Sequence, residues 1–182
     1  HFHMGGVKVD ERGRSSLPGL WVCGEASSTG LHGANRLASN GLLEALVYGK
    51  KAAEDIARTL GDIPEAEELT FTFPTGGEDV DEAAVMDLRR TMTTHVGVRR
   101  NADGLKQALA TIAGLEAAAN NETMRNMTAT ATLIAAAALT REESRGGHYR
   151  DDFPEQVPAL AHRTKITLEA AVGIRDAAKD MV

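Results

Sequence analysis

A glycine-rich segment near the start of the chain leads directly into a long amphipathic run. Residues 39–60 repeat apolar side chains with helical spacing, and Gly30, Gly33 and Arg36 come just before them. The apolar run Leu20–Cys23 precedes the segment and does not alternate with polar residues, so it predicts a central strand covered on both faces. Strand, glycine-rich loop and helix therefore occur in the order of a parallel α/β sheet. An anion-binding site is expected at the helix N-terminus.

The residues of this loop suit an electron-rich ligand. Glycines let the backbone approach a ligand closely, and Arg36 offers a planar fork of N–H donors for a carboxylate. Ser39 and Asn40 are good N-cap residues, so the first N–H groups of the helix are expected near the same place. Glu25, after the predicted strand, can accept a hydrogen bond from a ribose or polyol hydroxyl. The structural alternative stays open, because any α/β loop needs glycines, caps and capping carboxylates.

The composition argues against several classes of protein. A net charge of -6 at pH 7 disfavours generic nucleic-acid binding, since counterion release needs a basic face. The most apolar run, Ala129–Leu139, is too short to cross a bilayer, so no membrane span is expected. The single cysteine, Cys23, forms no disulfide within the chain and predicts a reducing cytoplasm and a buried packing role. His1, His3 and His32 have no third ligand at metal-binding spacing, so no metal site is expected.

The second half of the chain has a different pattern. Residues 65–80 contain acidic residues, a proline and two glycines, which is typical of a linker. Three helical patterns follow, over residues 81–98, 103–119 and 122–143, and they predict a three-helix bundle. The pattern after residue 159 is ambiguous. The sequence therefore predicts an α/β piece over residues 1–64 and a helical domain over residues 81–182.

Several motifs together resemble one known family of flavoproteins. They are His1-Phe2-His3-Met4-Gly5-Gly6-Val7, Gly13-Arg14 with Leu17-Pro18-Gly19-Leu20, Gly24-Glu25, Leu31-His32-Gly33-Ala34-Asn35-Arg36-Leu37-Ala38-Ser39-Asn40 and Ser144-Arg145-Gly146-Gly147-His148-Tyr149-Arg150-Asp151-Asp152-Phe153-Pro154. The chain resembles the flavoproteins of succinate dehydrogenase, fumarate reductase and L-aspartate oxidase. The resemblance implies a mixed fold, in which a C-terminal piece of an α/β FAD-binding domain is followed by an all-α three-helix bundle domain.

Within that family, the motif details resemble the L-aspartate oxidases. The oxidase form is carried by Ser28-Thr29-Gly30-Leu31-His32 and by Leu42-Leu43-Glu44. This implies removal of hydride from Cα of L-aspartate to give iminoaspartate, with reduced FAD reoxidised by oxygen or fumarate. The product would enter quinolinate and NAD synthesis, with quinolinate synthase as a candidate partner. The alternatives are a succinate dehydrogenase or fumarate reductase flavoprotein, and a non-catalytic helical interaction module.

The resemblance also implies roles for particular residues. His1 and Arg36 would hold a substrate carboxylate, and Glu25 would contact the FAD. Ser39, Gly41 and Leu42 would lie against the flavin, where a helix N-terminus can stabilise negative charge that develops near N1 and O2. No residue of this chain is assigned as a catalytic acid or base.

Two features depart from the family pattern. Gly41 stands where the family usually has serine, so a hydroxyl contact to the cofactor is lost while the backbone N–H remains. The Gly-x-Gly-x-x-Gly fingerprint for the FAD pyrophosphate does not occur in this sequence, which opens at His1 inside a motif. We therefore expect a C-terminal fragment, inactive by itself and with little or no bound FAD. Arg145, His148 and Arg150 are expected either to face the active-site domain or to form salt bridges.

Overall fold

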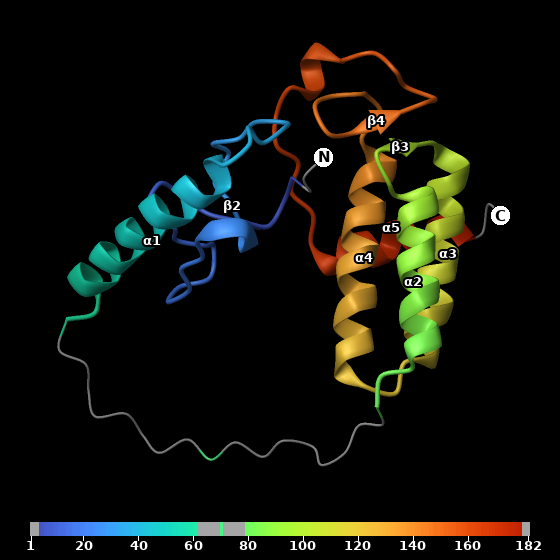
Figure 1. The fold of residues 1–182 in the computed structure, drawn as a ribbon, viewed down its shortest axis with the longest axis horizontal. Helices are drawn as coiled ribbons and strands as arrows, with labels where there is room; N and C mark the ends of the chain where they lie inside the picture. Colours follow the sequence, from blue (N-terminus) through green and yellow to red (C-terminus); the bar gives the residue numbers. More distant parts are fainter. Residues whose placement is uncertain (1–3, 62–69, 71–78, 180–182) are drawn as a thin grey trace. The chain divides into compact units, whose positions relative to one another are not determined.

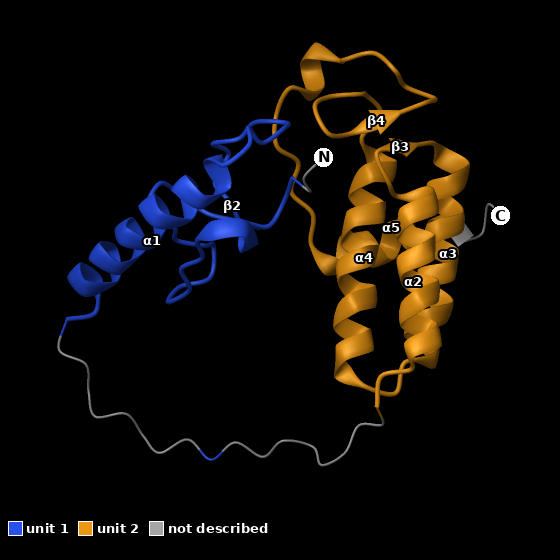
Figure 2. Cartoon of the chain, viewed as in Figure 1, with its two compact units in different colours: residues 1–72 blue, residues 73–182 orange. Residues whose placement is uncertain are grey.

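The computed structural model describes residues 4–61, 70 and 79–179. The chain divides into two compact units, residues 1–72 and 73–182 (Figure 2). The predicted linker, residues 65–80, lies almost entirely outside the described residues. Each unit has its own elements, which are described separately below (Figure 1).

The first unit is built on one long helix, α1, which spans Asn40–Thr59. Strand β1, Val7–Lys8, pairs in parallel with β2, Ser27–Ser28, and the 3-10 helix η1, Gly24–Ala26, packs on α1. The predicted amphipathic helix is therefore confirmed, and the strand pairing is parallel as the α/β pattern predicts.

The predicted central strand at Leu20–Cys23 is wrong. Trp21 takes part in one isolated antiparallel bridge, and the segment forms no further strand. Leu20 is 41% exposed and Cys23 is exposed as well, so the buried packing role expected for that thiol is also wrong. The physical reason lies in Trp21, whose indole Nε1 donates to the Asp55 carboxylate on α1 at 3.0 Å and holds the segment as a loop along the helix.

Asp55 anchors this loop to α1. Its side chain is only 2% exposed, and its carboxylate accepts hydrogen bonds from Arg14, Arg58, Trp21 and Arg12. The Arg14 hydrogen bond contributes most, and together these donors hold the pKa of Asp55 far below its usual range. One buried carboxylate therefore ties residues 12–21 to the C-terminal half of α1.

The second unit is a bundle of four helices: α2, Glu82–His95; α3, Ala102–Ala118; α4, Glu122–Thr140; and α5, Leu168–Lys179. Helix α3 packs against each of the other three, and α5 also packs on α4 (Figure 1). The predicted helical bundle is confirmed, but the predicted number of three helices is wrong, because the described residues of this unit form four. Its fourth helix, α5, comes from the tail whose sequence pattern is ambiguous.

Three of these helices begin with a side-chain cap. Asp81 accepts from the Ala83 backbone N–H at 2.9 Å, and Asn101 accepts from Gly104 at 2.8 Å. Asn121 likewise accepts from the backbone N–H at the third helical position of α4, at 2.8 Å. Each cap satisfies one N–H group that has no partner within its helix, which explains why the helices start where they do.

An apolar core lies between the helices of the bundle. Leu105, Leu109 and Ile112 of α3 are completely buried, and α4 and α5 contribute mainly alanines to the same cluster. Small side chains let helices approach closely, so these alanines suit a tightly packed bundle. Across the described ranges, no helix combines the length and apolar character that a membrane span needs.

A short two-stranded sheet and a 3-10 helix lie at one end of the bundle. Strand β3, Arg99–Arg100, pairs in parallel with β4, Tyr149–Arg150, and the 3-10 helix η2, Pro158–Leu160, follows in the same loop region (Figure 1). This region contains the Ser144–Pro154 motif of the sequence.

Candidate functional site

The N-terminus of α1 has an unusual backbone. Ser39 immediately precedes the helix in the left-handed conformation, with φ of 67°, and it is the one non-glycine residue with positive φ among those described. An N-cap residue normally has extended dihedral angles, and the Ser39 side chain makes no capping hydrogen bond. The predicted N-cap hydrogen bond is therefore absent. Strain of this kind is concentrated at functional sites.

Arg36 places a positive charge beside this helix end. Its Nη1 donates to Oε1 of Glu25 at 3.2 Å, and its side chain is 21% exposed. The guanidinium lies so close to Gly41 that a Cβ on this glycine would overlap it. A guanidinium and a helix N-terminus both attract anions, so this corner of the first unit suits a carboxylate.

The glycine at position 41 thus has a local consequence. A serine side chain there would require the Arg36 guanidinium to move, since the overlapping atoms are the far end of a flexible side chain. Glycine therefore allows the present Arg36–Glu25 arrangement. The glycine at position 41 therefore also affects the space that the Arg36 side chain occupies.

A second buried carboxylate on α1 holds the glycine-rich loop. Glu44 is 6% exposed, and it accepts a hydrogen bond from the Thr29 hydroxyl. Its Oε2 lies 2.7 Å from Nε2 of His32. Sequence reasoning missed this residue. A glutamate that directly follows the Leu42–Leu43 pair at the start of the helix is the feature of the sequence that could have indicated a buried, paired carboxylate.

Helix α1 also presents an apolar surface. Leu42 is 74% exposed and Leu46 is 73% exposed, and Leu43 and Val47 of the same helix are exposed as well, as are Leu31 and Leu37 in the loop before it. Large contiguous apolar surface usually marks a contact site. Leu42, which the resemblance places against the flavin, lies on this surface.

The predicted site residues can now be placed. The structure brings Glu25, Arg36 and Gly41 together, and Ser39 and Leu42 flank them along the chain. His1 lies outside the described residues. Within residues 4–61, 70 and 79–179, no group of three or more His, Cys, Asp or Glu side chains could hold a metal ion.

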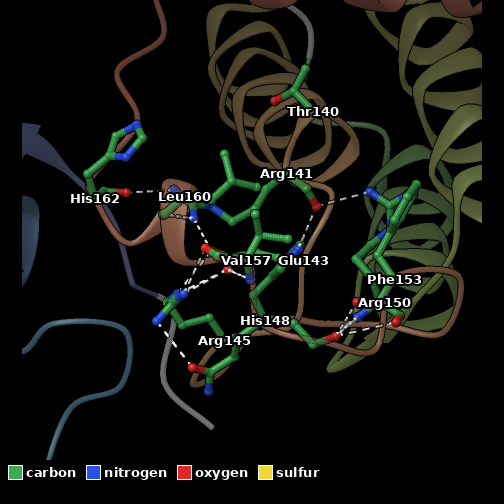
Figure 3. Close-up of polar contacts among 12 residues, drawn as sticks. Thr140, Arg141, Glu143, Arg145, His148, Arg150, Phe153, Val157, Leu160 and His162 are labelled. Carbon is green, nitrogen blue, oxygen red and sulfur yellow. Dashed lines mark hydrogen bonds and ion pairs between the residues drawn. The ribbon is translucent and has the colours of Figure 1, made fainter.

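The Ser144–Pro154 motif lies in a polar network within the second unit (Figure 3). Glu143 is completely buried and accepts hydrogen bonds from Arg141 at 2.5 Å, from Arg145 at 2.9 Å and from the Val157 backbone N–H at 2.9 Å. The Arg145 hydrogen bond contributes most to lowering the pKa of Glu143 to about 2. This carboxylate closes residues 141–157 into one compact loop.

Arg150 and His148 attach that loop to α4. Arg150 is 1% exposed and donates to the carbonyl oxygens of Ala138 and Leu139 at 3.0 and 2.9 Å, in the last turn of the helix, where carbonyl groups have no partner within a helix. His148 Nδ1 lies 2.8 Å from Arg100 Nη1, which can only donate, so Nδ1 accepts and the ring is neutral. Burial, followed by the neighbouring arginines, lowers the pKa of His148.

The sequence leaves two interpretations of Arg145 and Arg150, which are contact with the active-site domain and salt bridges. The contacts that these two side chains make in the structure are salt bridges. Arg145 pairs with Glu143, and Arg150 pairs with Asp152 at 2.8 Å. A surface hollow of about 450 Å³ adjoins the loop, lined by Ser144, Arg145, Gly146, His148, Tyr149, Pro154, Glu155 and Gln156. Two of the side chains that line the hollow, the cationic Arg145 and the neutral His148, are engaged in the internal network.

Two family models match the chain. Residues 1–42 match an FAD binding domain, and residues 85–175 match the fumarate reductase flavoprotein C-terminal domain. The second match covers half of the chain and coincides with the helical bundle.

Similar proteins of known name are mainly L-aspartate oxidases. The chain is 49% identical to the L-aspartate oxidase of Rhodospirillum rubrum over 90% of this chain and 59% of that protein. It is 43% identical to the L-aspartate oxidase of Agrobacterium fabrum over 96% of this chain and 32% of that protein. The chain therefore spans 59% of the length of the first of these relatives and 32% of the second.

Solved structures of similar fold come from flavoproteins of the same family. The Mycobacterium smegmatis Sdh1 complex in its apo form is 32% identical, with a TM-score of 0.72, over 88% of this chain and 32% of that one. The Escherichia coli quinol fumarate reductase subunit FrdA is 25% identical, with a TM-score of 0.66, over 88% of this chain. The fold, the motifs and the matching models agree, and the chain belongs to the fumarate reductase flavoprotein family, with L-aspartate oxidases as its relatives.

Proposed function

We propose that this chain is the C-terminal part of an FAD-dependent L-aspartate oxidase. The observation that carries the proposal is the Arg36 guanidinium beside Gly41 at the N-terminus of α1, in a chain 49% identical to an L-aspartate oxidase. A fixed guanidinium at a helix N-terminus is suited to a carboxylate, and aspartate carries two. The expected product is iminoaspartate.

The described residues fit an FAD on three counts. Ser39 leaves the first N–H groups of α1 without a side-chain cap, and Gly41 adds no side chain over them. The Glu25 side chain is 69% exposed and can accept a hydrogen bond from a hydroxyl group. When bound, FAD would supply the acceptor for hydride from Cα of the substrate. Glu25, Ser39, Gly41 and Leu42 would hold the cofactor.

Arg36 and His1 would hold the substrate. A bidentate guanidinium contact fixes both the position and the orientation of a carboxylate, which brings Cα into line with its acceptor. A lysine at this place would give one point charge and less orientation. In this proposal Arg36 acts by binding and orienting, and no proton transfer is assigned to it.

The wider context follows from the same proposal. Oxygen or fumarate would reoxidise the cofactor, and iminoaspartate would pass to quinolinate and NAD synthesis, with quinolinate synthase as a partner. The single exposed Cys23 agrees with a reducing cytoplasm as the compartment. The isolated chain is expected to be inactive and to bind little FAD, since its sequence lacks the pyrophosphate fingerprint.

A succinate dehydrogenase or fumarate reductase flavoprotein is the second candidate. It is favoured by the likeness to Sdh1, at a TM-score of 0.72 and 32% identity. Both candidates use a dicarboxylate and FAD, so the corner formed by Arg36 and α1 serves either. The substrate alone separates them.

Steady-state assays of the intact protein test the proposal. We expect turnover of L-aspartate, and Arg36→Leu should lower kcat/KM at least ~100-fold while FAD stays bound. Arg125→Leu is the matched control, because this exposed arginine forms a surface ion pair with Glu122 and lies in the helical bundle. Turnover of succinate without aspartate would support the second candidate and contradict the first.

A further inference from the structure

The loop that carries Arg36 has little regular structure of its own. Between β2 and α1, the described backbone hydrogen bonds are short turns, such as Gly33 N–H to the Gly30 carbonyl at 3.3 Å and Asn35 N–H to the His32 carbonyl at 3.3 Å. Turns of this kind shape the loop without fixing it on the rest of the unit. Side-chain ties to α1 and η1 must therefore set its position.

Glu44 supplies two of those ties from one buried carboxylate. A carboxylate only accepts, so the Thr29 hydroxyl donates to Oε1, and the same hydroxyl accepts from the Leu31 backbone N–H at 3.1 Å. His32 Nε2 donates to Oε2 at 2.7 Å. With Glu44 only 6% exposed, water competes little for these hydrogen bonds.

The placement of Glu44 on α1 connects these ties to the substrate corner. Glu44 lies three residues after Gly41, so both are within one turn of the helix. His32 lies four residues before Arg36 in the loop. Glu44 thus holds the start of the loop, at Thr29 and His32, on the first turns of α1. The Arg36 guanidinium, near the end of the loop, lies beside Gly41 in the same part of the helix.

We propose that Glu44 is a positioning residue for the substrate site, which fixes the loop through Thr29 and His32 so that Arg36 reaches the N-terminus of α1. The inference rests on the proposed function, in which Arg36 binds a substrate carboxylate. Glu44 touches neither substrate nor cofactor in this role. Its effect passes through the loop, because orientation of a binding group depends on the residues that support it.

The chain offers a matched control on the same helix. Asp55 is also a buried carboxylate of α1, but it holds residues 12–21 and not the Arg36 loop. If Glu44 acted only by stabilising the fold, Glu44→Gln and Asp55→Asn would have similar effects on catalysis. If Glu44 positions the substrate site, the two effects separate.

The first experiment measures KM and kcat of the intact protein with the dicarboxylate that it oxidises. Glu44→Gln should raise KM about tenfold, with a smaller change in kcat and unchanged FAD content. Thr29→Val should raise KM in the same direction, and Thr29→Ser, which keeps the hydroxyl, should restore it. Asp55→Asn should leave KM unchanged. An unchanged KM in Glu44→Gln, or an equal rise in Asp55→Asn, would overturn the inference.

The second experiment measures amide hydrogen exchange in the same variants and needs no substrate. Glu44→Gln should speed exchange about tenfold or more in peptides covering residues 29–37, without a matching change over residues 12–21. Asp55→Asn should show the reverse pattern. Equal exchange in both segments would overturn the positioning role. Failure of the wild-type protein to oxidise any dicarboxylate would instead contradict the proposed function, and the exchange result would still decide whether Glu44 fixes the loop.

Discussion

The two units of this chain are held together in different ways. In the helical unit, Leu105, Leu109 and Ile112 are completely buried and pack with alanines from α4 and α5. In the first unit, the described hydrophobic side chains that are buried are Val9 and Ala52, whereas Glu44 and Asp55 are buried carboxylates. An apolar core thus stabilises the bundle, and charged hydrogen bonds fix the loops of the first unit.

The difference indicates which unit carries the candidate site. The bundle packs a cluster of apolar side chains in its interior, and its polar network fixes one loop to the end of α4. The first unit leaves the leucines of α1 exposed and gathers Arg36, Glu25 and Gly41 at one helix end. A unit with few internal apolar contacts and a strained helix start has the features expected of a site-bearing unit.

The largest expected effect comes from the core of the bundle. Leu109→Ala should lower the free energy of unfolding by about 3 kcal/mol, since the side chain is completely buried and leaves a cavity. Leu46→Ala, on the 73% exposed side chain of α1, should change it by less than about 0.5 kcal/mol. Denaturant unfolding followed by circular dichroism checks the first variant, and Trp21 fluorescence checks the second. Equal losses would contradict the contrast between the units.

Asp55→Asn should destabilise the first unit selectively. The change removes the acceptor shared by Arg14, Arg12, Arg58 and Trp21, and leaves donors around a weaker amide oxygen. Trp21 is the only tryptophan in the sequence, so its fluorescence reports unfolding of the first unit alone. The fluorescence midpoint should fall while the helical signal of the bundle keeps its midpoint. A parallel fall in both would show that the units do not unfold separately.

Glu143→Gln should change how the bundle responds to acid. The folded pKa of Glu143, about 2, lies below its ordinary value of 4.5, so its contribution is present above pH 4.5 and is lost as the pH falls from 4.5 to 2. The variant should be less stable at neutral pH and should lose less stability over that acidic interval. Urea unfolding of the helical signal at several pH values measures this. If the unfolding free energy of the wild type fell with pH as steeply as that of the variant, the ion pairs of Glu143 with Arg145 and Arg141 would not stabilise the fold.

Gly41→Ser should have the smallest effect on stability. Serine is tolerated better than glycine in a helix, and the clash is with a flexible guanidinium, so the unfolding free energy should change by about 0.5 kcal/mol or less. The Arg36–Glu25 pair, however, must rearrange. Trp21 fluorescence unfolding should therefore show little change, while the KM for aspartate in the intact protein shifts. A stability loss as large as that of Leu109→Ala would show that position 41 is rigidly packed.

Local signals predict the helices well. Apolar periodicity and the caps Asp81, Asn101 and Asn121 define the starts of α2, α3 and α4. Helix α5 gives a weaker signal, because much of its inner face is alanine and its attachment depends on Arg175 binding Glu116 of α3. That partner lies 59 residues away and leaves no local trace in the sequence.

The sequence predicts residues of the candidate site but not the side chains that hold those residues in place. Arg36 and Glu25 follow from motif resemblance, and the structure pairs them at 3.2 Å. The strand at Leu20–Cys23 is wrong because an apolar run cannot reveal that Trp21 bonds to a carboxylate 34 residues away. Glu44 is missed for the same reason, since its partners belong to a loop that precedes the helix.

The role of Arg36 in binding the substrate can be measured by anaerobic reduction of the flavin bound to the intact protein. L-Aspartate should bleach the flavin absorbance of the wild-type protein, and the Arg36→Leu variant should keep both its FAD and its colour when aspartate is added. Bleaching of Arg36→Leu at the wild-type rate would contradict the assignment of Arg36 to the substrate carboxylate.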